Sequence, residues 1–387
     1  MNKRNLSLDI FRALTMTLMV FVNDFWSVLD VPHFLEHYDT LEDGMGLSDF
    51  VYPMFLFAMG MAVPYALETR IACGASLWSC FTHILERTLA LLLMGAFIVN
   101  AEEGIAWNKG VYWLLMLLGF FFTWNQYPKE AKYRTPLRAS GIILLTGLAL
   151  AFRSPDEGLF RASWWGILGQ IGWMYLFSST AYLLCRGKKG LLAGIWALLC
   201  LYNLTSAPMR GGDTLIPGNF IRDFAYTLQI GNGHSVIMAM GGVLASLASL
   251  RLQEMKPGMR AGIGLAAAAV LATLGLAAHT GWIISKNLGT LPWCLLVSAT
   301  SVALYTLLRV LERKGLTAWA RPISTAGTAT LTVYMIPYLY YSFWVFLNPT
   351  IPLWLSGWAG VLKCALFSAL CILTARALGK AGIKLKI

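Results

Sequence analysis

Residues 7–23, SLDIFRALTMTLMVFVN, decide the fold, because they join an apolar run of membrane length to a few regularly spaced polar residues. About 20 apolar residues in a helix cross the ~30 Å hydrocarbon core of a bilayer, and similar runs recur along the whole chain. We predict a first transmembrane helix over residues 8–28. It is expected to be retained, because Asp9 and Arg12 interrupt the run and no small-residue cleavage site follows.

The polar residues of this segment share one face of the predicted helix. Steps of three, four and eleven residues return to the same face, which here contains Asp9, Arg12, Thr15, Met19 and Asn23. Ionisable residues inside a span usually face the bundle interior or a wet cavity. The stripe therefore indicates a polar path through the protein, and the alternative is a structural ion pair between Asp9 and Arg12.

The composition excludes a soluble protein. Hydrophobic residues make up 57% of the chain and charged residues 13%, whereas soluble domains carry about 25% charged residues. The net charge of +11 comes from Lys and Arg in short connections, so it marks topology and not a nucleic-acid surface. The seven cysteines show no metal-ligand spacing, and no metal is expected.

Twelve apolar segments are candidate spans. They are residues 8–28, 50–69, 79–99, 111–126, 137–153, 163–185, 189–203, 234–252, 261–284, 292–312, 326–348 and 356–378. The fourth, fifth and seventh are short. The sequence therefore predicts an all-α polytopic membrane protein of about twelve helices (ten to twelve), folded as a single domain over residues 1–387.

Loop charge sets the expected orientation, because Lys and Arg concentrate in cytoplasmic connections. Basic residues gather near both termini and in the even-numbered connections. The first connection has no Lys or Arg and contains Asp30, Glu36, Asp39, Glu42, Asp43 and Asp49. We predict that both termini are cytoplasmic and that this acidic connection lies outside.

Most of the histidines fall on the predicted outer side, namely His33, His37, His234 and His279. Lys286 and Asn287 lie in the next outer turn. Histidine, with a pKa of about 6.5, serves as a general base near neutral pH, and the amides of Asn23 and Asn287 can donate to an oxyanion. The cluster indicates acid–base chemistry outside, and the alternative is that polar residues gather at any membrane interface.

Residues 7–23, the loop with His37 and residues 46–57, GLSDFVYPMFLF, together resemble the heparan-α-glucosaminide N-acetyltransferase family and its bacterial membrane homologues. Those proteins have a Ser-x-Asp-x-Phe-Arg-Gly helix ending near Val-Asn, then a histidine loop, then a helix with Asp and Phe-Pro. Weaker matches follow in family order at residues 166–172, 235–242 and 285–290. Among the departures, Ala13 replaces the Gly of Phe-Arg-Gly and Gln170 stands in place of an arginine.

The resemblance implies transfer of an acetyl group from cytosolic acetyl-CoA to an amine, such as that of glucosamine, on the outer side. The family's catalytic histidine matches His37, with His33 as the alternative. Asn23 and Asp49 match family residues, and Asp49 is expected to cap its helix or support the histidine. Arg12 and Arg87 are expected to bind the phosphates of CoA.

The expected acceptor site consists of Asp39, His234, His279, Lys286 and Asn287. Two other functions stay open: a transporter or flippase of an amphiphilic or sugar substrate, and a sugar O-acetyltransferase. The expected location is the bacterial cytoplasmic (inner) membrane. The expected partners are the lipid bilayer, acetyl-CoA and an amino-sugar or glycan acceptor, and a homodimer is left open.

The orientation can be tested with a cysteine in the acidic connection. Thr40→Cys should react with a membrane-impermeant maleimide added to intact cells, because a connection without Lys or Arg is expected on the outer side. Labelling that occurs only after lysis would reverse the orientation and contradict transfer across the membrane.

Overall fold

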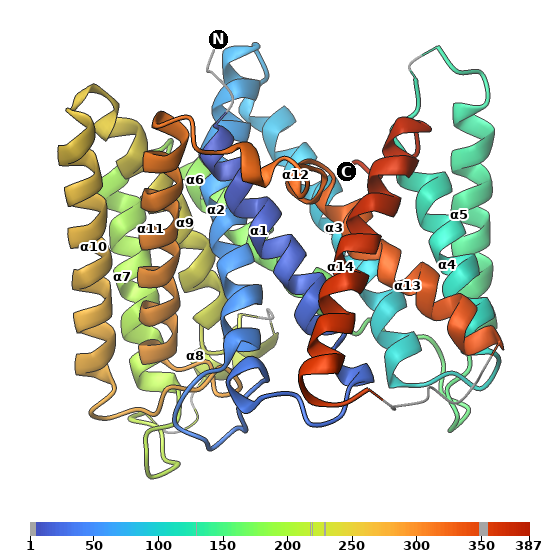
Figure 1. The fold of residues 1–387 in the computed structure, drawn as a ribbon, viewed down its shortest axis with the longest axis horizontal. Coiled ribbons are helices and arrows are strands. Elements are labelled where there is room, and N and C mark those ends of the chain that lie inside the picture. Colours follow the sequence, from blue (N-terminus) through green and yellow to red (C-terminus); the bar gives the residue numbers. More distant parts are fainter. Residues whose placement is uncertain (1–4, 129, 217, 219, 228–229, 348–354) are drawn as a thin grey trace. The chain divides into compact units, whose positions relative to one another are not determined.

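The computed structural model describes residues 5–128, 130–216, 218, 220–227, 230–347 and 355–387. These residues form α-helices joined by turns and short 3-10 helices, so the predicted all-α class is confirmed for the described part of the chain (Figure 1). The helices are α1 Leu6–Asn23, α2 Leu47–Ala72, α3 Leu77–Glu103, α4 Lys109–Trp124, α5 Arg134–Ala151, α6 Ile167–Leu184, α7 Lys189–Ser206, α8 Phe220–Thr227, α9 His234–Arg251, α10 Pro257–Ala278, α11 Leu291–Arg313, α12 Ser324–Thr328, α13 Thr330–Leu347 and α14 Gly357–Lys380.

Each of the twelve predicted segments overlaps one of the longer helices. The predicted 326–348 segment corresponds to the end of α12 and to α13, and its last residue lies outside the described residues. The short helix α8 was not predicted. The largest differences are at helix ends. The α1 helix ends at Asn23 and is followed by a 3-10 turn, Phe25–Ser27. The predicted 261–284 segment stops at Ala278, because residues 279–290 form an irregular connection rich in side-chain hydrogen bonds.

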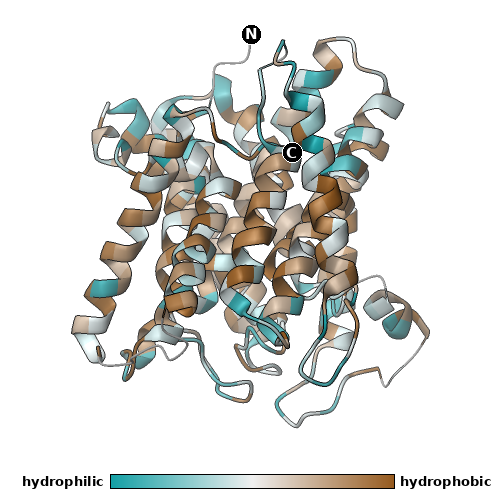
Figure 2. Cartoon of the chain, turned by 90° about the vertical axis from the view of Figure 1, so that its right-hand side faces the viewer, coloured by the Kyte–Doolittle hydropathy of each residue, from teal (hydrophilic) through white to brown (hydrophobic). Residues whose placement is uncertain are grey.

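Among the residues that the structure describes, eight helical segments are long and apolar enough to cross a membrane. They are Leu6–Ser27, Leu47–Ala72, Leu77–Glu103, His234–Glu254, Pro257–Ala278, Leu291–Arg313, Thr330–Leu347 and Gly357–Lys380. Figure 2, in which the ribbon is coloured by hydropathy, shows mainly apolar residues along the middle of the helices and polar residues toward their ends and connections. The count of twelve spans and the cytoplasmic termini stay predictions.

The helices divide between two compact units, and the treatment of residues 1–387 as one domain stays a prediction. The first unit consists of residues 1–15, 32–88 and 171–321. Its centre is the crossing of α2 and α9, where a Cβ on Gly60 would lie 1.9 Å from the Ala239 carbonyl oxygen and one on Gly242 would lie 2.0 Å from that of Phe57. Such small residues let two helix backbones approach closely in a membrane.

The second unit consists of residues 16–31, 89–170 and 322–387. In it α4 packs against α5 and α13, and α13 against α14. Its interior contains a buried charge, because Asp24 is fully buried and accepts hydrogen bonds from Lys363 Nζ and Tyr341 Oη, both at 2.7 Å. A buried carboxylate needs partners of this kind to offset its lost hydration.

Candidate functional site

Two connections of the first unit meet at the N-terminal ends of α2 and α11. The residues before α2 bind the residues before α11 through Gly44 N to Ile284 O at 2.9 Å and Ser285 Oγ to Thr40 O at 3.0 Å. Asn287 Nδ2 adds a bond to Tyr38 O at 3.2 Å. The predicted outer residues His37, Lys286 and Asn287 are therefore brought together.

His37 and Asp49 form the core of this site. The His37 Nδ1 lies 2.7 Å from Asp49 Oδ1, and the side chains are 49% and 2% exposed, respectively. Because an ionised carboxylate can only accept, the Nδ1 of His37 donates in this pair and Nε2 carries the lone pair. The pair therefore presents a basic nitrogen on an accessible ring that a buried acid orients.

Asp49 is itself held by the backbone around it. Its Oδ2 accepts the backbone N–H groups of Tyr38 at 3.1 Å and Gly46 at 3.0 Å. The second bond caps α2, because Asp49 stands three residues after the N-cap. Gly46 is required here, since a Cβ would lie 2.0 Å from the Glu36 carbonyl oxygen.

Lys286 lies directly beside this pair. Its Nζ lies 3.0 Å from His37 Nδ1, 3.3 Å from Nε2 and 3.9 Å from Asp49 Oδ1. Burial lowers the pKa of Lys286 below its ordinary value, and the charge of Asp49 only partly opposes this shift. Lys286 thus places a partly desolvated amine directly beside the imidazole.

Asp43 also links the connection before α2 to the connection before α11. Its carboxylate lies 2.8 Å from both His279 Nε2 and Arg210 NH2, and it accepts the backbone N–H of Ile284 at 2.9 Å. Burial acts to raise the pKa of Asp43, but the hydrogen bonds from Ile284, His279 and Arg210 outweigh it, so the pKa is lowered. His279 therefore has a clear structural role in this clamp.

The second histidine of the acidic connection has other partners. His33 Nε2 lies 2.6 Å from Glu42 Oε1, and the His33 ring stacks on Tyr38 with centroids 4.3 Å apart. The side chain of His33 is 61% exposed. Its partner Glu42 is a half-buried acid, 35% exposed, in contrast to the buried Asp49 that orients His37.

His234 lies against the connection that contains Lys286. Its Nδ1 is 2.6 Å from Asn232 Oδ1, and Asn232 Nδ2 donates to Leu288 O at 2.6 Å. A Cβ on Gly289, whose φ is +59°, would lie 2.5 Å from His234 Nδ1. These contacts shape the turn that presents Lys286.

Four further residues were predicted for the site, namely Asp39, Arg12, Arg87 and Asn23. Asp39 is exposed, and its backbone N–H binds Glu42. Arg12 is half-buried on α1, and the guanidinium of Arg87 lies over the Tyr175 ring at 4.7 Å. Asn23 is exposed and belongs to the second unit. Their catalytic and binding roles stay predictions.

Sequence reasoning missed two residues that the structure gives clear partners. Arg210 completes the Asp43 clamp from a connection that carries no motif. Asp24, next to the predicted Asn23, is the buried acid of the second unit and pairs with Lys363. An ionisable residue inside each of two predicted spans was a signal that could have identified this pair.

The helices and this cluster define a helical protein suited to the membrane, with a His–Asp–Lys site at one end of its first unit. Within that class, the family model described as "Domain of unknown function (DUF5009)" matches residues 4–212, and the chain belongs to this family.

Two acetyltransferases are similar to part of the chain. Heparan-alpha-glucosaminide N-acetyltransferase of Mus musculus is 29% identical over 138 residues, which cover 31% of this chain and 20% of the mouse protein. The Homo sapiens protein of the same name is 28% identical over 110 residues, which cover 27% of this chain and 15% of the human protein. The matched part is thus a fifth or less of each relative's length.

The Asp43 clamp predicts a measurable contribution to stability. Asp43→Ala should lower the free energy of unfolding by about 1–3 kcal/mol, because it leaves charged and backbone donors without their acceptor. Since the folded pKa is lowered, the contribution should be complete above the ordinary value of 3.8 and should disappear as the pH falls through the folded pKa. Thermal unfolding of purified protein between pH 3 and pH 7, conditions that span that value, measures this.

Asp39→Ala is the matched control, because it removes an exposed carboxylate from the same connection. It should change stability by no more than about 0.5 kcal/mol. Equal effects of the two substitutions at neutral pH would show that Asp43 does not clamp the connections.

Proposed function

We propose that the chain is a transmembrane acetyltransferase that moves an acetyl group from cytosolic acetyl-CoA to an amine at the outer face of a bacterial cytoplasmic membrane. The observation that carries the proposal is the His37–Asp49 pair, in which a buried acid orients an accessible imidazole. The similarity to two N-acetyltransferases supports the reaction class. An amino sugar such as glucosamine is the proposed acceptor.

The chemistry of the step fits the groups at the site. The acceptor nitrogen attacks the thioester carbonyl, a C–N bond forms, and the C–S bond to CoA breaks. His37 Nε2 takes the proton from the attacking amine and returns it to the leaving sulfur. Asp49 holds the ring in the tautomer that leaves Nε2 basic and stabilises the imidazolium that forms.

The oxyanion that develops on the carbonyl needs a donor or a positive charge close to the base. Lys286 Nζ, within 3.3 Å of both His37 ring nitrogens, is the described group that meets this need. Asn287 Nδ2 is engaged with Tyr38 O, so its role in this proposal is to fix the connection that carries Lys286. Asn23 is kept as a second candidate donor.

The donor is proposed to enter from the opposite end of the first unit. Asn5 Nδ2 binds Tyr65 Oη at 3.0 Å and Tyr305 Oη at 2.9 Å, which places the start of α1 near the C-terminal parts of α2 and α11. His37 lies at the N-terminal ends of those helices. Arg12, one turn and a half into α1, is therefore at the end suited to CoA phosphates, and Arg87 is proposed as its partner.

The acceptor is proposed to arrive as a cation and to lose its ammonium proton to solvent before it attacks. Asp39, Glu42 and Glu36 lie in the connection around His37 and give it a negative field. Such a field raises the local concentration of a protonated amino sugar. His234 and His279 are proposed to line the approach from the neighbouring connections.

The decisive variant is His37→Ala. It should lower acetyl transfer from labelled acetyl-CoA to glucosamine by at least about 10²–10⁴-fold, the usual effect of losing a general base. The side chain is half exposed in a connection, so its removal opens no core cavity, and the backbone N–H groups of Tyr38 and Gly46 still bind Asp49. The variant should therefore stay folded. Binding of acetyl-CoA should persist.

His33→Ala is the control, because it removes the same side chain from the same connection. It should keep most of the activity. Loss of activity in His33→Ala with retention in His37→Ala would move the base to His33. Full activity in both variants and in the double variant would show that neither His37 nor His33 is the catalytic base, and would favour transport as the function.

A further inference from the structure

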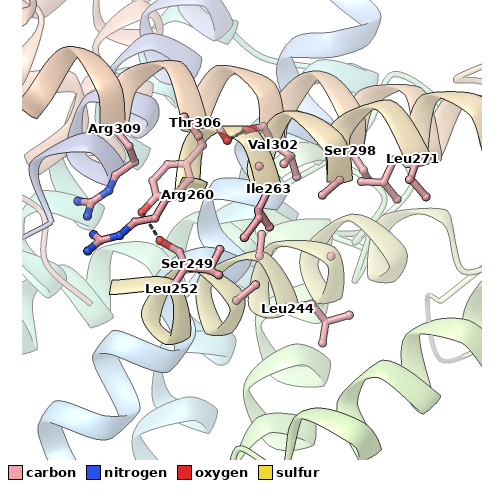
Figure 3. Close-up of a pocket in the computed structure, with 18 of the residues that line it drawn as sticks. Leu244, Ser249, Leu252, Arg260, Ile263, Leu271, Ser298, Val302, Thr306 and Arg309 are labelled. Atoms are coloured by element: carbon pink, nitrogen blue, oxygen red, sulfur yellow. Dashed lines mark hydrogen bonds between the residues drawn. The ribbon is translucent and has the colours of Figure 1, made fainter. Parts of the chain in front are cut away.

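A cavity of about 450 Å³ lies in the first unit, far along the helices from His37. It is lined mainly by α9, α10 and α11, with Phe57 of α2 and Trp196 of α7, and both α9 and α10 pack against α11. Figure 3 shows Leu244, Ile263, Leu271 and Val302 arranged around it. Almost all of its lining is apolar, so the body of the cavity suits a hydrocarbon chain.

One end of this cavity is strongly basic. Arg260, Arg309 and Arg313 all line it, and Figure 3 shows Arg260 and Arg309 side by side there. Within the described residues, the acid paired with this group is Glu312, 3.2 Å from Arg309. Three guanidinium groups and one carboxylate leave a net charge of +2 at this end.

Neighbouring guanidinium groups repel one another, yet Arg260, Arg309 and Arg313 lie close together in the structure. Arg260 lies close enough to Arg309 and Arg313 to be affected by both charges, and its Nε donates to the Met255 carbonyl oxygen at 2.7 Å. Guanidinium groups bind phosphate oxygens in a bidentate fork. A phosphate at this end would offset the repulsion.

The length of the cavity matches one leaflet of a bilayer. From Arg260 to Leu271, α10 rises about 16 Å at 1.5 Å per residue, and one leaflet is about half of a ~30 Å hydrocarbon core. Only 11% of the apolar window of α10 is buried inside the protein, so this helix is suited to face lipid. The cavity therefore lies directly behind a helix whose opposite face is suited to contact lipid.

We infer that this cavity binds an anionic phospholipid from the leaflet at its arginine end. The phosphate lies among Arg260, Arg309 and Arg313, and one acyl chain lies between α9 and α10. Basic pockets between transmembrane helices recognise anionic headgroups by this combination of charge and shape. The inference does not depend on the acetyl transfer proposed for the His37 site.

Native mass spectrometry of the purified full-length protein tests it, with palmitoyl-oleoyl phosphatidylglycerol and the phosphatidylcholine of the same chains as probes. The phosphatidylglycerol should bind more tightly. Arg260→Gln and Arg313→Gln should each weaken its binding about fivefold, as expected for one basic residue near an anionic headgroup. Arg251→Gln, an exposed arginine that does not line the cavity, should leave binding unchanged.

A second pair of variants tests whether an acyl chain occupies the cavity. Ala267→Phe fills the cavity and should abolish binding of both lipids, whereas Ala266→Phe, on the exposed face of α10, should not. Thermal unfolding of each variant verifies folding. Equal binding of the two lipids with no effect of the arginine substitutions would overturn the inference. Full competition by inorganic phosphate, with no effect of Ala267→Phe, would identify a simple anion site instead.

Discussion

The hydrogen bonds of the Asp49 carboxylate are the constraint on which the site depends. This carboxylate is almost fully buried, and a buried charge is costly unless hydrogen bonds satisfy it. Its donors are His37 and the backbone N–H groups of Tyr38 and Gly46. One residue therefore begins α2, fixes the path of the acidic connection and sets the tautomer of the imidazole.

Hydropathy predicted the helices well and their ends less well. In a bilayer, long apolar runs such as those of α2 and α11 form helices, because a helix satisfies every backbone polar group within the segment. The end of α10 was missed because residues 279–284 are apolar enough to continue a helix, yet their backbone binds Asp43 and Thr290 instead. Contacts between residues that are distant in the sequence therefore determine where this helix ends, and the local hydropathy pattern does not.

The site was predicted in part. A contact of Asp49 with His37 was one of the two roles expected for Asp49, and the approach of Lys286 follows from a contact between residues 249 positions apart in the chain. Arg210 carries no pattern of its own and is explained only by the folded position of Asp43. The cavity that contains Arg260, Arg309 and Arg313 is formed mainly by residues of α9, α10 and α11, which are separate segments of the sequence. From the sequence, these arginines indicated only the orientation of the chain in the membrane.

The most direct measurement is a double-mutant cycle between His37 and Asp49 in the rate of acetyl transfer to glucosamine. If Asp49 acts through the imidazole, Asp49→Asn should slow the wild-type protein and add nothing further to the residual rate of His37→Ala. Asparagine can still accept backbone hydrogen bonds at the start of a helix, so the fold should persist. An Asp49→Asn effect of the same factor in both backgrounds would contradict the account.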